Sequence, residues 1–227
     1  VTSIGSSAFF GCSSLASIAI PDSVTSIGNA TFQGCSSLTS VSLGKALVSL
    51  GLDAFKGCSS LSSLRVESAI VERNCHYDKR DTDSFVSRYF PDQKKYRLEE
   101  VYIGGAATRM GSLAFYGSGV KNVTIGQSVT SIGERAFEGC GSLVSVTIPN
   151  SVTSIGQAAF LGCSSMTSIT IGSGGMTTIN GHTFKGCRSL TSITIGSGVT
   201  SIGTSAFYGA ALVKNLTLPA SVTSIGS

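Results

Sequence analysis

A segment of 23 residues repeats along almost the whole chain. Val24 to Ala46 reads VTSIGNATFQGCSSLTSVSLGKA, and the 23 residues before it read VTSIGSSAFFGCSSLASIAIPDS. Further copies begin at Val129 and Val152. A fixed period of this length is typical of a solenoid, in which each repeat packs only against its neighbours. The repeat therefore predicts a single elongated domain over residues 1–227. Since both ends of the chain fall inside a repeat, we also expect it to be a fragment of a longer protein.

Apolar residues return at fixed positions within each copy. The pattern Leu15-x-x-Ile18-x-Ile20 followed by Pro predicts a short strand with one face in a core. The Ala-Phe-x-Gly-Cys segment predicts one helical or 3₁₀ turn. We therefore expect about nine coils, each with a strand, a bend, a second extended piece and a short turn. Stacked coils turn the Phe position into a core column of Phe9, Phe32, Phe55, Phe115, Phe137, Phe160, Phe184 and Phe207.

Six of the seven cysteines occupy one position of the repeat. Within runs of adjacent copies they lie 23 or 24 residues apart, which is the period of the repeat and not the spacing of a zinc site or a disulfide scaffold. They are expected to form a second core column of buried thiols. Its members are Cys12, Cys35, Cys58, Cys140, Cys163 and Cys187. Cys75 stands outside this pattern, and the sequence leaves open whether it is free or paired.

The motif as a whole resembles a known repeat family. An L-x-x-I-x-I strand followed by P-x-S-V-T-S-I-G-x-x-A-F-x-G-C-S-S is similar to the BspA-like class of leucine-rich repeats, over residues 1–69 and 98–227. The resemblance implies a curved right-handed solenoid with a parallel sheet on its concave face. It also implies a surface or secreted protein that binds other proteins or host components. An export signal or anchor is then expected outside this fragment.

The fourth copy carries an insertion, residues 70–97. Residues 70–100 hold 14 of the chain's 28 charged residues, together with five aromatic residues. Insertions in a solenoid are often binding loops, and aromatic and Arg side chains dominate interfaces. On the neighbouring strands, outward positions that are small elsewhere become large or charged. These features predict a partner-binding patch of Arg65, Glu67, Tyr77, Arg80, Arg88, Tyr89, Tyr96, Glu100 and Tyr102.

The insertion also allows a structural interpretation. Its aromatic side chains can fold back onto the solenoid, with Phe85 or Phe90 in the place that the fourth copy leaves vacant in the Phe column. Metal binding is disfavoured, because the acids, Cys75 and His76 fit neither zinc spacing nor an EF-hand loop. The acids concerned are Asp78, Asp81 and Asp83.

Composition and motifs exclude several classes of function. Charged residues make up only 12% of the chain, and the net charge of +4 includes no Lys/Arg block that would predict nucleic-acid binding. No apolar run approaches the roughly 20 residues of a membrane span. No nucleophile elbow, phosphate loop or paired-carboxylate constellation is present, so we expect neither an enzyme nor a cofactor.

Three functions remain. The first is a non-catalytic module that binds a protein or glycan through the concave face and the insertion. The second is a structural spacer or assembly subunit that docks onto neighbouring proteins. The third is ice binding by the outward Ser/Thr ladder, which Glu100 and Tyr102 interrupt. Three Asn-x-Thr sequons, at Asn29, Asn122 and Asn215, are near the number expected by chance in so Ser/Thr-rich a chain, and the sequence does not tell whether they are glycosylated.

Overall fold

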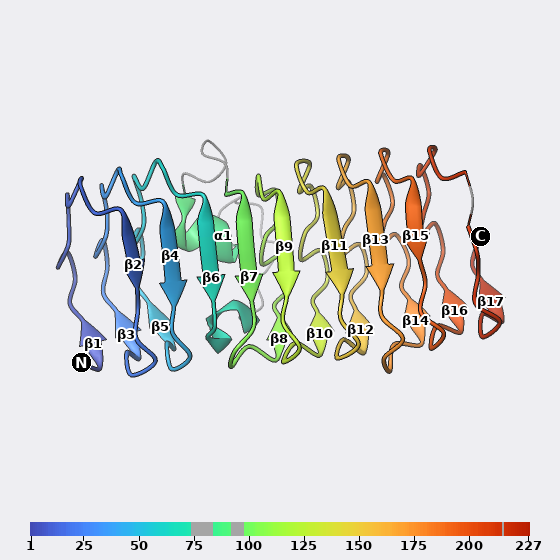
Figure 1. Ribbon diagram of the computed structural model, residues 1–227, viewed down its shortest axis with the longest axis horizontal. Coiled ribbons are helices and arrows are strands. Elements are labelled where there is room, and N and C mark those ends of the chain that lie inside the picture. The colour runs from blue at the N-terminus through green and yellow to red at the C-terminus, as the bar shows by residue number, and fades with distance from the viewer. Residues whose placement is uncertain (74–83, 92–97, 215) are drawn as a thin grey trace.

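The protein is a row of about nine coils that share one continuous core. The computed structural model describes residues 1–73, 84–91, 98–214 and 216–227. Figure 1 shows the coils side by side, with the two chain termini at opposite ends of the row. The expected leucine-rich-repeat solenoid is therefore confirmed.

Within the described residues, eight of the coils contribute one strand each to a long parallel sheet, here called the main sheet. Its eight strands lie in the order β15-β13-β11-β9-β7-β6-β4-β2. They are β2 (Ser17–Ala19), β4 (Ser40–Leu43), β6 (Ser63–Val66), β7 (Glu100–Ile103), β9 (Asn122–Ile125), β11 (Ser145–Ile148), β13 (Ser168–Ile171) and β15 (Ser192–Thr194). Buried and more exposed residues alternate along these strands, as in Ser63–Val66, so one face enters the core and the other faces solvent.

A second row of two-residue strands forms three small parallel sheets. The first sheet contains β1 (Ser3–Ile4), β3 (Ser26–Ile27) and β5 (Ser49–Leu50). The second contains β8 (Arg109–Met110), β10 (Ser131–Ile132) and β12 (Ser154–Ile155). The third contains β14 (Thr178–Ile179), β16 (Ser201–Ile202) and β17 (Ser224–Ile225). The first break falls at the insertion. The second falls between β12 and β14, where the copy that begins at Val152 is one residue longer than the 23-residue period, at Gly174–Gly175.

The segment between the two rows of strands is not helical, although the sequence predicts a helical or 3₁₀ turn there. Alternate amides leave the coil: those of Ala30, Phe32 and Gly34 donate to carbonyls of the next coil at 2.8–3.0 Å. The amides between them close local turns, as Gln33 does on the Ala30 carbonyl at 3.2 Å. Ala30 and Gly34 adopt positive φ angles of 54° and 78°. A helix would direct every amide inside its own coil, so bonding between coils replaces it.

The phenylalanines form a stack that runs the length of the row. Phe9 and Phe32 lie 5.3 Å apart between ring centroids with an interplanar angle of 4°, and the other regular neighbours are similar. Phe32 and Phe160 are fully buried, whereas Phe9, in the first of the described coils, is 38% exposed. Phe207 is partly buried in the last coil.

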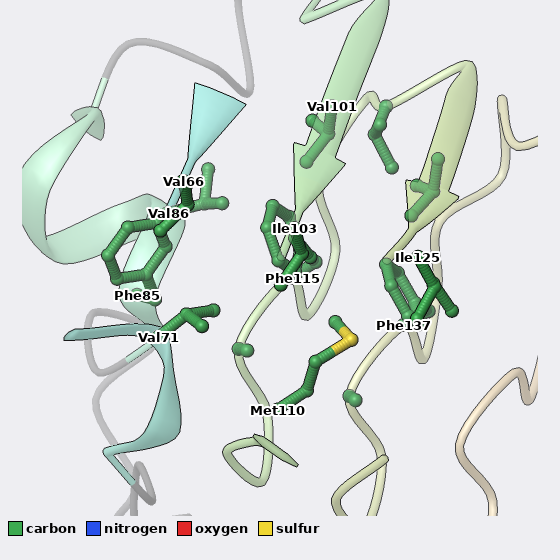
Figure 2. Packing of buried hydrophobic residues seen from close by; sticks show 14 of the residues in the cluster. Val66, Val71, Phe85, Val86, Val101, Ile103, Met110, Phe115, Ile125 and Phe137 are labelled. Carbon is green, nitrogen blue, oxygen red and sulfur yellow. The ribbon is translucent and has the colours of Figure 1, made fainter. Parts of the chain in front are cut away.

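The insertion supplies the missing members of this stack. It contains the 3₁₀ helix η1 (Ala69–Glu72) and the α-helix α1 (Phe85–Tyr89). Phe90 stacks on Phe55 at 4.9 Å and 7°, and Phe85 links Phe90 to Phe115 at 5.8 and 6.1 Å. Figure 2 shows Phe85 beside Val66 and Val71, with Phe115 in the neighbouring coil. The prediction that one of the two fills the vacant place is confirmed, and both are used.

The main sheet continues across the insertion without a break. β6 pairs directly with β7, with Ser63 opposite Glu100 and Val66 opposite Ile103. In the second row, η1 takes the place of a strand beside β8. Its Glu72 carboxylate accepts hydrogen bonds from the amide and the hydroxyl of Thr108, the latter at 2.9 Å. In a regular coil that amide is bonded by a main-chain carbonyl, as Thr130 is by Thr108.

The cysteine column is buried from Cys35 onward, whereas Cys12 is exposed in the first coil. Each buried thiol also donates a hydrogen bond to the carbonyl of a Phe one coil earlier, such as Cys163 to Phe137 at 3.2 Å. The fifth coil has Ser118 at this position, 3% exposed. Burial raises the pKa of the Cys140 and Cys187 thiols to about 12. These thiols therefore remain neutral donors.

The Phe stack predicts that the insertion is part of the core. Phe90→Ala should lower the free energy of unfolding by about 3–5 kcal/mol, because it leaves a cavity between Phe55 and Phe85. Phe10→Ala is the control, since Phe10 is 58% exposed and its loss should change stability by about 0.5 kcal/mol or less. Chemical denaturation of both variants measures the difference, and equal stabilities would contradict the stack.

The raised thiol pKa values predict a loss of stability in alkali. In the unfolded chain Cys140 and Cys187 ionise near their ordinary pKa of 9.0, whereas in the fold they stay neutral up to about pH 12. Their contribution is therefore complete below pH 9 and falls as the pH rises toward 12, by about 1.4 kcal/mol per pH unit for each thiol. Denaturation of the wild type and a Cys140→Ala/Cys187→Ala variant at several pH values checks this. Parallel curves for the two proteins would refute it.

Candidate functional site

The solvent side of the main sheet, here called the main-sheet face, carries two rows of side chains. The strand register fixes both rows. One runs Ser17, Ser40, Ser63, Glu100, Asn122, Ser145, Ser168 and Ser192. The other runs Ala19, Ser42, Arg65, Tyr102, Thr124, Thr147, Thr170 and Thr194. Only at β6 and β7 do the rows carry large or charged residues, which makes these strands the distinctive part of the face.

Arg65 and Tyr102 form the centre of this distinctive part. They are direct register partners on β6 and β7, and the Arg65 guanidinium carbon lies 3.7 Å from the centroid of the Tyr102 ring. Arg65 Nε also donates to the carboxylate of Glu67, whose side chain is 18% exposed. The Arg65 side chain is held in place by two contacts of its guanidinium, one with the Tyr102 ring and one with the Glu67 carboxylate. The pair therefore presents a pre-ordered cationic and aromatic surface.

Two glycines make room for the tyrosine ring. A Cβ atom built on Gly104 would lie 2.4 Å from the Tyr102 hydroxyl oxygen, and one on Gly126 would lie 3.0 Å from it. The phenol therefore lies along the sheet, over the ends of β7 and β9. Pro or another side chain at these positions would displace the ring.

Polar contacts continue the site toward β9. Asn122 donates from its side-chain amide to a Glu100 carboxylate oxygen at 2.8 Å, and the two are register partners. Lys121 and Glu99 form an ion pair at 3.2 Å nearby. Glu100 and Arg65 are both exposed, so charges of both signs are available on this part of the face.

A groove of about 370 Å³ lies on the main-sheet face next to these residues. It is floored by β9 and β11 and lined by Asn122, Thr124, Gln127, Ser145, Thr147 and Pro149. Because Thr124 is the register partner of Tyr102, the groove lies on the strand next to the tyrosine. We call Arg65, Glu67, Glu100 and Tyr102 together with this groove the recognition patch. The sequence does not reveal the groove, since its small Ser and Thr residues are ordinary strand formers.

Of the insertion residues predicted for the patch, the structure describes Arg88 and Tyr89, and neither lies on the main-sheet face. Tyr89, predicted to contact a partner, is only 3% exposed and packs its ring edge against Phe85 at 5.5 Å, so it belongs to the core. Arg88 is exposed on α1, 5.9 Å from the Tyr89 ring, but Figure 1 draws α1 behind β6 and β7, away from the main-sheet face. Tyr77, Arg80 and Tyr96 lie outside the described residues.

Neither a metal cluster nor a membrane-spanning helix occurs among the described residues. Within residues 1–73, 84–91, 98–214 and 216–227, no three His, Cys, Asp or Glu side chains gather as metal ligands would. Cys75, His76, Asp78, Asp81 and Asp83 fall outside those ranges. Among the helices described, none has the length and apolar character needed to cross a membrane.

Similar folds occur among solved bacterial proteins. A leucine-rich repeat protein from Bacteroides ovatus is 23% identical, with a TM-score of 0.50, and the match covers 100% of this chain and 79% of that one. One from Eubacterium ventriosum is 21% identical, also with a TM-score of 0.50, and covers 100% and 78%. At these levels of identity, the two matches show a shared fold and nothing about function. A search among curated proteins found no match to this sequence.

The repeat itself gives the more specific comparison. A family model for the BspA type leucine rich repeat region matches residues 1–85 and 94–227, in six copies. The match covers nearly all of the chain and includes the coils on both sides of the insertion. The chain therefore belongs to the BspA-type leucine-rich repeat family.

Proposed function

We propose that the chain is a non-catalytic binding module of a surface or secreted protein and that it recognises a protein or glycan through the recognition patch. One observation carries the proposal: on a face of small polar residues, the ordered Arg65–Tyr102 pair stands beside a groove. The surface or secreted location in this proposal is the one that the family resemblance implies.

The composition of the patch favours a protein partner. Arg and Tyr are enriched among the residues that contribute most to protein interfaces, and they act best when surrounded by near-neutral contacts that exclude water. Ser63, Thr124 and Ser145 supply such a surrounding on the adjacent strands. Since Arg65 is already held by Glu67 and Tyr102, little side-chain entropy is lost when a partner binds.

The patch also has a rigid support. β6, β7, β9 and β11 are consecutive strands of one sheet, and their inward residues Leu64, Val101 and Val123 are each no more than 6% exposed. A site on packed strands keeps its geometry better than one on a loop. Recognition is therefore expected without a large rearrangement of the coils.

Arrays of purified extracellular-matrix proteins and of defined glycans test the proposal. Arg65→Ala/Tyr102→Ala should weaken each wild-type signal by about 30-fold or more, the effect of losing interface residues of the first rank. Thr147→Tyr should also abolish binding, because it fills the groove without changing the charge. Thr170→Ala is the matched control, since it lies in the same row two strands beyond Thr124.

Two results would argue against the patch. Signals that survive both Arg65→Ala/Tyr102→Ala and Thr147→Tyr would place the binding surface elsewhere on the chain. Arrays on which the wild type binds nothing would favour the alternative of a spacer or assembly subunit. Thermal unfolding of each variant shows that its fold is retained.

A further inference from the structure

The C-terminal part of the chain has cations without acidic partners. No Asp or Glu follows Glu138 in the sequence, whereas Lys185, Arg188 and Lys214 do. In the N-terminal coils, by contrast, Lys45, Lys56 and Lys121 each pair with a carboxylate at 3.2–3.4 Å. Among the ion pairs formed by the described residues, none includes Lys185 or Arg188.

One repeat position shows the difference most directly. Lys56 and Lys185 occupy equivalent places, just before the Gly-Cys of their coils. Three residues earlier, the third coil has Asp53, which pairs with Lys56 at 3.4 Å, whereas the eighth coil has His182. The same backbone therefore supports a neutralised Lys in one coil and an unpaired Lys in the other.

Lys185 and Arg188 line a pocket of about 340 Å³ between the turns that follow β12, β14 and β16. Leu161, Ser164 and Tyr208 complete its side-chain walls, and its floor consists of glycines 162, 186 and 209. The Lys185 amine lies 5.2 Å from the centroid of the Tyr208 ring, and Tyr208 is 68% exposed. The volume lies within the range of small-molecule sites, about 300–1,000 Å³.

The floor carries no side chains because its three residues are glycines. Each has a positive φ, between 73° and 83°, which favours glycine. A Cβ atom on Gly186 would lie 3.5 Å from Gly162 Cα, so stacking leaves space there and the backbone angle is what favours Gly. Three glycines in adjacent coils thus line the pocket without side chains. The two cations line the same pocket, with an exposed aromatic ring on the coil beyond.

We propose that this pocket binds a carboxylated or sulfated sugar unit of a glycan. An Arg guanidinium and a Lys amine together match a carboxylate or sulfate group, which the pocket itself does not supply. Leu161, the Tyr208 ring and the three glycines leave apolar surface and space that suit a ring-shaped ligand with one apolar face. The pocket shares no residue with the recognition patch, so this inference does not rest on the function proposed for that patch.

Amide NMR titrations with single sugars test the proposal on the intact chain. Glucuronic acid and galactose 6-sulfate should shift the amide signals of Gly186 and Gly209, whereas glucose should not. The dissociation constants from the two titrations show whether the pocket prefers a carboxylate or a sulfate. Lys185→Gln and Arg188→Gln should each weaken binding of the preferred sugar by about tenfold, the effect of losing one charge-assisted hydrogen bond. Tyr208→Ala should weaken it as well.

Lys214→Gln is the matched control, because Lys214 is an exposed cation of the same acid-free part of the chain but lies outside the pocket. Its affinity should equal that of the wild type. A loss as large as that of Lys185→Gln would reveal only a diffuse attraction to positive charge and overturn the site. Equal shifts with glucose, or no shifts with glucuronic acid or galactose 6-sulfate, would also overturn the site. The same holds if a tetrapeptide of Asp and Glu binds more tightly at the same amides. Arg65→Ala/Tyr102→Ala should bind the sugars normally, so the two proposals fail separately.

Discussion

Hydrogen bonding between neighbouring coils is the constraint on which the rest of the structure depends. In the turn segments every second amide is bonded to the next coil. In both rows of strands, parallel pairing also joins each coil to its neighbours. Each coil therefore stacks at the spacing of a β-sheet, and side chains at one position meet their equivalents in register. Stacked Phe rings about 5 Å apart are a result of that spacing. Where η1 replaces a strand beside β8, the Glu72 carboxylate accepts from the Thr108 amide in place of the main-chain carbonyl of a regular coil.

Most of the fold can be predicted from the sequence, because a repeat converts one local pattern into a column. The Phe and Cys positions identify the core, and the alternation in Leu15-x-x-Ile18-x-Ile20 identifies the main strand. The turn segment cannot be predicted in the same way. Ala30 and its equivalents hold positive φ angles that their side chains disfavour, and bonds to the adjacent coil help to stabilise that conformation.

The candidate site is less predictable, because it depends on what surrounds each side chain. Arg65, Glu100 and Tyr102 stand out in the sequence as exceptions to a row of small residues, and the strand register brings them together. Tyr89 has the same residue type as Tyr102 but turns inward, since α1 packs against Phe115 and the turn of the following coil. The groove beside Tyr102 and the pocket at Lys185 are shapes that small residues leave open, and composition alone does not show them.

The continuous pairing of β6 with β7 has a consequence for how such a chain changes over time. The sheet pairs Ser63 with Glu100 in the same way as it pairs residues one ordinary repeat apart. The pairing is therefore independent of the length of chain between the two strands. Phe90 on Phe55 and Phe85 beside Phe115 then connect the interior on either side. The fourth coil is thus a place where the scaffold can accommodate a longer segment without losing its sheet or its core.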